Sequence, residues 1–256
     1  MNKLNLKKIT EELLQTFLDA GKVAKDKNVK GLKIIIKADK SPVTDGDLEV
    51  DKMLRKKISN ITPNIPIISE ETVDLKKKND FKDFWLIDPI DGTRDYINKR
   101  DEYTLNASLI INLKPALGIV YAPAKDRLFF SYGMDLSFEI SNGKTKKLNC
   151  DKKNKGEIVA LANSDSTPRE VLDIYKKNKV SKIIKMSSSL KFCIIATGEA
   201  DIYAAKARAF EWDIAAGHAI LKHAGGKVTD FQGNEILYGK EDFKNSSLII
   251  KNKDII

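Results

Sequence analysis

The feature that most constrains this chain is an apolar run that ends in two closely spaced carboxylates. Phe84-Trp85-Leu86-Ile87 has the pattern of a buried strand, and it leads directly into Asp88-Pro89-Ile90-Asp91-Gly92-Thr93. Proline lacks a backbone N–H and stops the strand, while glycine allows a close backbone approach. The pattern predicts a strand-to-helix corner where Asp88 and Asp91 point into one small volume, followed by a helical turn at 94–98.

Asp88 and Asp91 are compatible with a metal site and with an ordinary turn. Carboxylates this close raise each other's pKa unless a cation neutralises them, and oxygen ligands without Cys or His suit Mg²⁺ or Mn²⁺. N–H groups at a helix start suit phosphate, and a metal beside an anion cradle is what phosphoryl transfer requires. Asp-Pro and Asp-Gly are also frequent in turns, so this segment alone favours neither interpretation.

Three further acidic segments could bring carboxylates to the same corner. They are Thr44-Asp45-Gly46-Asp47, Ser69-Glu70-Glu71-Thr72 and Glu211-Trp212-Asp213. Each also has a simpler explanation: Asp47 in a turn, Glu70 at a Glu-rich helix start, and Asp213 as an N-cap.

The remaining pattern predicts an α+β half followed by an α/β half. The elements expected in the first half are amphipathic helices at 4–25 and 46–59 and strands at 65–69, 84–87, 103–111, 115–121 and 127–132, the last three forming an antiparallel meander. The elements expected in the second half are strands at 157–162, 182–186, 201–204 and 227–229 and helices at 168–177, 189–198 and 213–223. We therefore predict that 1–150 carries most metal ligands and that 151–256 carries a substrate-binding segment.

Composition argues against several other kinds of site. The 256-residue chain has a formal net charge of +9, but its lysines are spread thinly and are not interleaved with aromatic residues as in a nucleic-acid groove. Two histidines and two cysteines give little material for a zinc site, a Ser-His-Asp triad or a disulfide framework, and Cys193 is expected to be buried and reduced. Without a signal-peptide or membrane-span pattern, we expect a cytoplasmic monomer or homodimer that binds a phosphorylated small molecule, with no nucleic-acid partner and no stable membrane insertion.

Taken together, the motifs resemble the inositol monophosphatase superfamily. The resemblance covers nearly the whole chain and is carried by 88–93, Glu70-Glu71 and Trp212-Asp213 with Ala215-Ala216-Gly217, in the family's order and at similar separations. Finer features resemble one branch of that family, the 3′(2′),5′-bisphosphate nucleotidases of the CysQ type. The segments that carry this second resemblance are 41–44 with Asp47, 92–97, 98–110 with Glu102, Tyr103, Thr104 and Asn106, 188–193 and 198–201.

The resemblance implies a layered α/β/α/β/α sandwich, like that of the sugar phosphatases, and a site for two Mg²⁺ ions. Glu70, Asp88 and the backbone carbonyl of Ile90 would hold one ion. Asp88, Asp91 and Asp213 would hold the second, with Asp88 bridging. The resemblance also leaves room for a third, weaker ion near Glu70.

The resemblance also implies catalytic and substrate-binding residues. Thr93 and Glu70, with Asp47, would orient or deprotonate the attacking water. The substrate-binding residues would be Gly92 and Thr93 through their amides, and Ser188, Ser189, Lys191 and Arg208. The implied reaction removes the 3′-phosphate of adenosine 3′,5′-bisphosphate, with its sulfated analogue PAPS as a related substrate and Li⁺ as an inhibitor.

Two departures from the branch pattern keep an alternative substrate class open. The branch commonly has Tyr-Pro-Arg where this chain has Tyr203-Ala204-Ala205, with Lys206 and Arg208 slightly later, and it has a Ser-x-Ser-His-like motif where this chain has Asn163-Ser164-Asp165-Ser166. The alternative is an inositol monophosphatase or a broad-specificity sugar phosphatase. A non-catalytic binding module is disfavoured, because every implied metal carboxylate is present.

Overall fold

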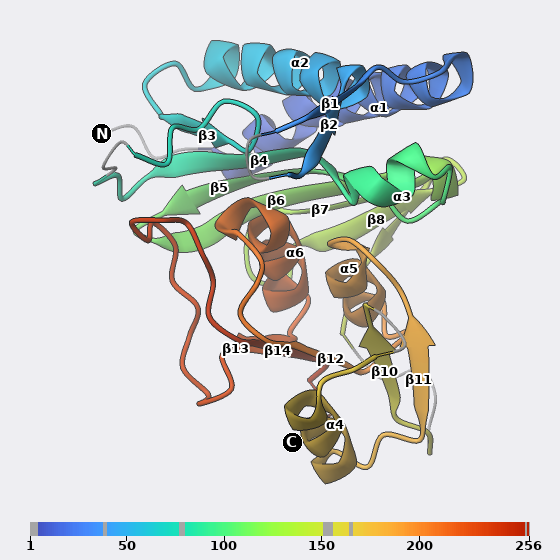
Figure 1. Ribbon diagram of the computed structural model, residues 1–256. Helices are drawn as coiled ribbons and strands as arrows, with labels where there is room; N and C mark the ends of the chain where they lie inside the picture. Colours follow the sequence, from blue (N-terminus) through green and yellow to red (C-terminus); the bar gives the residue numbers. More distant parts are fainter. Residues whose placement is uncertain are drawn as a thin grey trace.

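The chain folds into alternating layers of helices and sheets (Figure 1). The computed structural model describes residues 5–37, 40–76, 80–150, 156–163, 166–253 and 255. The layers, in order, are helices α1 (Leu6–Lys30) and α2 (Asp45–Ile61), a seven-stranded sheet, helices α5 (Leu190–Ala196) and α6 (Glu211–His223), a five-stranded sheet, and helix α4 (Arg169–Lys177). This arrangement confirms the predicted α/β/α/β/α sandwich.

The larger sheet has the strand order β3-β4-β5-β6-β7-β8-β9, and only its β3–β4 pair is parallel. The strands are β3 (Ile67–Ser69), β4 (Phe84–Asp91), β5 (Thr104–Ile111), β6 (Lys114–Ala122), β7 (Arg127–Ser131), β8 (Ser137–Ser141) and β9 (Lys144–Lys147). The predicted meander of β5, β6 and β7 is confirmed, whereas β8 and β9 were not predicted. Four small elements complete this half: strands β1 (Ile34–Ile36) and β2 (Pro42–Thr44), which form a hairpin, the short helix α3 (Thr93–Ile97) and the 3₁₀ turn η1 (Pro123–Lys125).

The smaller sheet has the order β11-β10-β12-β14-β13. Its strands are β10 (Val159–Ala162), β11 (Lys182–Lys185), β12 (Ile202–Ala205), β13 (Lys227–Thr229) and β14 (Leu248–Lys251). The strands β10, β11 and β12 run parallel, and β14 pairs antiparallel with both β12 and β13. Strand β14, which was not predicted from the sequence, therefore joins β13 to the parallel strands.

Strand β4 is covered on both faces, which explains its uninterrupted apolar sequence. Trp85 and Ile87 belong to the apolar cluster formed with α1 and α2, where Phe17 is fully buried. Phe84 and Leu86 point the other way, into the cluster that contains α5 and α6. Successive side chains of a strand alternate between its faces, so this one strand anchors both cores.

Helix α6 lies unusually close to its neighbours because small residues line the contacts. A Cβ atom at Gly118 of β6 would lie 2.4 Å from the carbonyl oxygen of Ala216, and one at Gly217 would lie 2.6 Å from the Phe192 side chain. Only glycine allows such approaches. The close contact fixes α6 against both β6 and α5, and the first turn of α6 carries Asp213.

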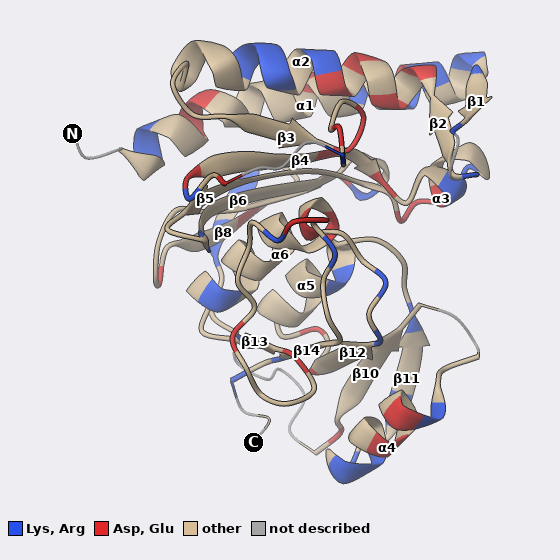
Figure 2. Ribbon diagram, turned by 60° about the vertical axis from the view of Figure 1, so that its left-hand side comes forward, with Lys and Arg blue, Asp and Glu red and all other residues tan. Residues whose placement is uncertain are grey.

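The charged residues do not gather into one stripe. Helices α1, α2 and α4 each carry both basic and acidic residues, and in α2 the acidic residues occupy the first half and the basic residues the second (Figure 2). Within the described ranges, no helix has the length and apolar character needed to cross a membrane. Cys150 and Cys193 are both buried thiols, as expected for Cys193. The boundary at residue 150 stays a prediction: the two sheets lie on either side of it, yet one apolar cluster contains residues of both.

Candidate active site

A bulge in β4 brings Asp88 and Asp91 to the same side of the sheet. Side chains three residues apart on a regular strand face opposite ways. Here β4 advances three residues from Asp88 to Asp91 while β5 advances two, from Asn106 to Thr104. Pro89, which has no N–H for the ladder, lies inside this shift. The prediction that Pro89 stops the strand is wrong, because β4 continues to Asp91. The two aspartates still come together as predicted, and the irregular register rather than a strand end produces the corner.

Three carboxylates meet at this corner. Oxygen atoms of Glu70, Asp88 and Asp213 all lie within 4.8 Å of one another. Glu70 follows β3, and its amide donates to the carbonyl of Ile87 on β4 (3.1 Å), so the parallel strand pair places it. Asp213 lies in the first turn of α6 and accepts from the amide of Phe210 (2.9 Å). The expectation that these segments converge is correct.

The acidic cluster is electrostatically incomplete by itself. Burial raises the pKa of Asp88 well above its ordinary value, and the charges of Glu70, Asp91 and Asp213 raise it further. Burial likewise raises the pKa of Asp213, and it raises that of Asp91 to about 6 although Lys191 acts in the opposite direction. Within the described part of the chain, Oδ1 of Asp88 is buried without a hydrogen-bond partner. A buried carboxylate oxygen without a hydrogen-bond partner, in a cluster whose possible metal ligands are all oxygen atoms, fits a hard divalent cation such as Mg²⁺.

Thr93 and Asp47 form a hydrogen-bonded pair beside the cluster. The Thr93 hydroxyl lies 3.2 Å from Asp47 Oδ1 and 3.1 Å from the carbonyl oxygen of Ile90. Asp47 is itself held in a capping box, because its Oδ2 accepts from the amide of Thr44 (2.8 Å) at the start of α2. Burial raises the pKa of Asp47. The same residues that begin α2 thus fix a carboxylate next to the corner.

The loop before α5 crosses from the other half of the chain to reach the aspartates. The amide of Ser189 donates to Asp91 Oδ2. The Ser189 hydroxyl donates to Asn106 Oδ1 (2.6 Å) and lies 2.8 Å from the hydroxyl of Thr104, both on β5. Ser189 is therefore bound to protein groups through both its amide and its hydroxyl.

Lys191 is a buried cation on the opposite wall. Its ammonium group donates to the carbonyl of Ser188 (2.5 Å) and lies 5.1 Å from the ring centroid of Tyr203. Burial lowers the pKa of Lys191 to about 8, while Asp91 acts against that shift. The Tyr203 hydroxyl in turn accepts from Asn163 Nδ2 (2.6 Å). These contacts hold the positive charge of Lys191 where it acts on Asp91.

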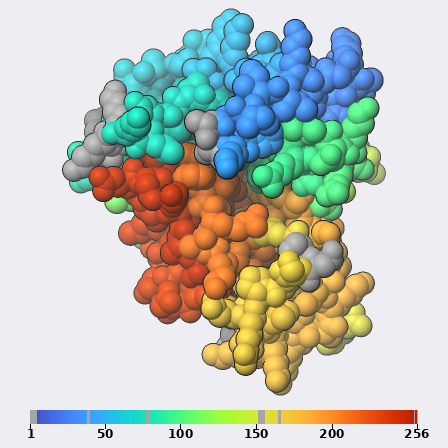
Figure 3. Space-filling view, in the orientation of Figure 1, coloured from blue at the N-terminus to red at the C-terminus, as the bar shows by residue number. Residues whose placement is uncertain are grey.

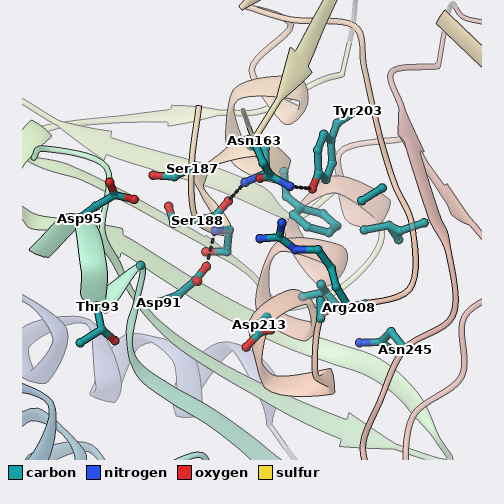
Figure 4. Close-up of a pocket in the computed structure, with 18 of the residues that line it drawn as sticks. Asp91, Thr93, Asp95, Asn163, Ser187, Ser188, Tyr203, Arg208, Asp213 and Asn245 are labelled. Carbon is teal, nitrogen blue, oxygen red and sulfur yellow. Dashed lines mark hydrogen bonds between the residues drawn. The ribbon is translucent and has the colours of Figure 1, made fainter. Parts of the chain in front are cut away.

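One pocket of about 430 Å³ joins the acidic and basic groups. Figure 3 shows the hollow between the blue-to-green N-terminal part and the orange C-terminal part, and Figure 4 shows Arg208 reaching across it. The predicted site residues that line the pocket are Glu70, Asp91, Gly92, Thr93, Ser188, Ser189, Lys191, Arg208 and Asp213. Asp47, Asp88 and Ile90 are buried, and they lie next to lining residues through the contacts given above. Ser164 and Asp165, part of the second departure from the branch pattern, lie outside the described residues.

Several residues at the site had not been singled out. The ammonium group of Lys37 lies 3.1 Å from Glu70 and 2.8 Å from Glu71. Asn245 is almost fully buried in the pocket wall and its Oδ1 accepts from Lys240 (3.2 Å). Neither residue belongs to a local motif, and only the fold brings them to the pocket. Glu102 contacts Ser187, and no role was predicted for it from the sequence beyond its place in the 98–110 segment, which resembles the nucleotidase branch.

A buried acidic cluster that faces a basic wall across one pocket is the arrangement of a metal-dependent phosphatase. Comparison with known proteins agrees with that class. Residues 5–255 match the inositol monophosphatase family, and the chain therefore belongs to the inositol monophosphatase family. The resemblance predicted from the sequence is confirmed.

Several proteins similar to this chain belong to one branch of the family, the bisphosphate nucleotidases. The chain is 41% identical over 211 residues (82% of its length and 78% of the relative's) to the 3′(2′),5′-bisphosphate nucleotidase CysQ of Buchnera aphidicola subsp. Acyrthosiphon pisum. It is 32% identical over 227 residues (84% and 87%) to the CysQ nucleotidase of Escherichia coli K12. The crystal structure of CysQ from Bacteroides thetaiotaomicron matches with a TM-score of 0.79 at 28% identity, covering 97% of this chain and 98% of that one.

Proposed function

We propose that this protein is a Mg²⁺-dependent 3′(2′),5′-bisphosphate nucleotidase that removes the 3′-phosphate of adenosine 3′,5′-bisphosphate to give AMP. The observation that carries the proposal is the single pocket with Asp91 and Asp213 at one end and Lys191 and Arg208 at the other. A nucleotide with two phosphates can present one to the metal end and the other to the cations. The relatives that are 41% and 32% identical carry the same activity in their names.

The metal end suits two Mg²⁺ ions. The groups that would hold them are Glu70, Asp88 and the Ile90 carbonyl for one ion, and Asp88, Asp91 and Asp213 for the other. When bound, the ions supply positive charge that stabilises the phosphoryl oxygens and favours ionisation of water. A third, weaker ion near Glu70 would compete with the Lys37 ammonium group, which lies 3.1 Å from that carboxylate.

Thr93 is the group best placed to orient the attacking water. Its hydroxyl has one proton and two acceptors, and the Asp47 carboxylate is a stronger acceptor than the Ile90 carbonyl. Once that proton points to Asp47, the lone pairs of the Thr93 oxygen are free to accept a hydrogen bond from water in the pocket. Glu70, which lines the same pocket, offers a carboxylate to take the proton that the water loses.

The substrate end binds the rest of the nucleotide. Lys191 offers a compact cation, and Arg208 is exposed at the pocket, where its guanidinium can bind a phosphate through two donors. Gly92 has a φ of 88°, and a Cβ there would lie 3.6 Å from the Cβ of Ser188, so a side chain would narrow the space between the two walls. The Gly92 and Thr93 amides are proposed to contact the phosphate that is removed.

A phosphate-release panel with Mg²⁺ tests the proposal. It compares adenosine 3′,5′-bisphosphate, inositol 1-phosphate, fructose 1,6-bisphosphate and 5′-AMP, with the Asp91→Asn variant as the control for contaminating phosphatases. We expect kcat/KM to be at least about tenfold higher for the nucleotide bisphosphate, with AMP as the organic product and inhibition by Li⁺. A tenfold preference for inositol 1-phosphate would reject the nucleotidase proposal in favour of the alternative substrate class.

Two finer points of the sequence analysis remain proposals. We expect a cytoplasmic protein, and a monomer or homodimer. Sedimentation at several protein concentrations measures the oligomeric state, and a tetramer would contradict that expectation.

A further inference from the structure

Glu102 holds the loop at 187–189 from the opposite half of the molecule. Its Oε2 accepts two hydrogen bonds from Ser187, one from the amide (2.9 Å) and one from the hydroxyl (3.2 Å). The two residues are 85 positions apart in the sequence, and both are half-buried. Glu102 precedes β5, the strand whose Thr104 and Asn106 bind Ser189. The loop is thus fixed at both of its ends by one short stretch of the N-terminal half.

The loop at 187–189 has an unusual backbone conformation, and its backbone groups bind both Lys191 and Asp91. Ser188 has a φ of 55°, in the left-handed region that residues other than glycine seldom adopt. In this conformation the Ser188 carbonyl accepts from the Lys191 ammonium group, and the next amide, that of Ser189, donates to Asp91. A strained residue persists only where its surroundings hold it. The contacts of Glu102 are part of what holds it.

The charge of Glu102 acts in two opposite ways at this place. It favours the ammonium form of Lys191, since it opposes the lowering of the pKa of that group by burial, but it also lies beside a wall that is proposed to bind an anion, and a negative charge there repels phosphate. Because these two effects oppose each other, we assign the positioning role of Glu102 to the hydrogen bonds that its oxygen accepts. A carboxamide oxygen in the same position could accept both of them without the charge.

We propose that Glu102 is a positioning residue for substrate recognition, which clamps Ser187 so that Ser188 and Lys191 are held ready for the second phosphate of a nucleoside bisphosphate. This inference rests on the proposed function, because it concerns the substrate end of the same pocket. Glu102 would thus influence substrate specificity without touching the substrate.

The test compares Glu102→Ala with Glu102→Gln. Loss of both hydrogen bonds in Glu102→Ala should raise KM for adenosine 3′,5′-bisphosphate about tenfold, with kcat changed less than about threefold. Glu102→Gln keeps an acceptor and removes a charge that both repels phosphate and favours the ammonium form of Lys191, so its KM should stay within about twofold of that of the wild type. With 3′-AMP, which lacks the 5′-phosphate, Glu102→Ala should change KM less than about twofold.

Asp101→Ala is the matched control, because Asp101 is the adjacent residue, is exposed and carries the same charge; its KM should remain that of the wild type. Glu102→Met, which fills the space without an acceptor, replaces the alanine variant if that variant does not fold. An unchanged KM in Glu102→Ala or Glu102→Met would overturn the proposal, and so would a Glu102→Gln variant as impaired as Glu102→Ala. Failure of the wild type itself to hydrolyse the bisphosphate would instead reject the proposed function.

Discussion

The two ends of the pocket are built in different ways. At the acidic end, Glu70, Asp88 and Asp213 lie at the end of a strand, inside a strand and in the first turn of a helix. At the basic end, Ser188 and Arg208 lie in loops, and Arg208 is exposed, while Lys191 is buried in the first turn of the short helix α5. Strands and helices packed on two cores keep side chains in place, whereas loops can vary without disturbing a core. Under the proposed function, the reaction chemistry would belong to the rigid layers, and substrate choice would depend on Lys191 of α5 together with the loops at Ser188 and Arg208.

The same two ends differ in how their charges are balanced. The carboxylates at the acidic end are buried and raise one another's pKa, so that end needs a cation from outside the chain. The basic end is partly satisfied by the protein, since Lys191 donates to the carbonyl of Ser188 and packs on Tyr203. Changes at the acidic end should therefore stop the reaction, while changes at the basic end should alter which substrate is bound.

The largest effect is expected for Asp91→Asn. The substitution removes a charge that would hold a metal ion but keeps an acceptor for the Ser189 amide, so the fold should persist. Because a metal ion is worth several kcal/mol of charge stabilisation in the transition state, we expect kcat to fall by about 10³-fold or more. Phosphate release under saturating Mg²⁺ measures this, and thermal denaturation checks folding.

Asp173→Asn is the matched control for that variant, because Asp173 is exposed on α4. Its activity should equal that of the wild type. Full activity of Asp91→Asn would remove the two-metal proposal and, with it, the contrast between the two ends.

An intermediate effect is expected for Arg208→Ala. Loss of a guanidinium that can bind phosphate through two donors should raise KM for adenosine 3′,5′-bisphosphate about tenfold and leave kcat nearly unchanged. Lys206→Ala is the control, because Lys206 is also exposed and basic but pairs with Glu170 at 3.0 Å. Steady-state kinetics of both variants measure the difference, and equal KM values would show that Arg208 does not bind the substrate.

The sequence was most informative where chemistry follows the chain locally. The segment from Asp88 to Thr93 could be interpreted by itself, and the Asp47 and Asp213 segments reinforced it. Even there, the pattern could not reveal that the two aspartates share one face because of a bulge, since the register depends on pairing with β5.

Residues that act through distant partners were much harder to predict. Ser189 was expected to bind substrate, and that role stays a prediction; its hydroxyl is bound to Thr104 and Asn106, more than eighty positions away. Strand β9 was also missed, because its residues are all exposed and mostly lysine and so lack the alternation that marks a strand. Pairing with β8, which no local pattern encodes, makes it a strand.

The smallest effect is expected on the thermal stability of the metal-free protein. It tests the charge balance at the acidic end without any enzymatic reaction. The folded-state pKa values of Asp88 and Asp213 are raised, and that of Asp91 is raised to about 6. A carboxyl group with a raised folded-state pKa stabilises the protein at low pH and loses that contribution as pH rises from its ordinary value through the folded one. The metal-free protein should therefore become less stable as pH rises above about 4, the contribution of Asp91 being lost by about pH 6 and those of Asp88 and Asp213 as their carboxyl groups ionise in turn.

Binding of Mg²⁺ should offset this loss, because the ion binds the charged folded cluster and not the unfolded chain. At 10 mM MgCl₂ we expect Tm to rise by about 3–5 °C at pH 7.5 and by about 1 °C or less at pH 5.5, where protons compete for Asp91. NaCl at matched ionic strength separates binding from screening. Asp88→Asn should lose most of the Mg²⁺-dependent shift and should be less sensitive to pH without metal, because the most crowded carboxylate is gone. Equal shifts at both pH values, or an undiminished shift in Asp88→Asn, would mean that Mg²⁺ stabilises the protein elsewhere and that the acidic end is not the place where charge remains unbalanced.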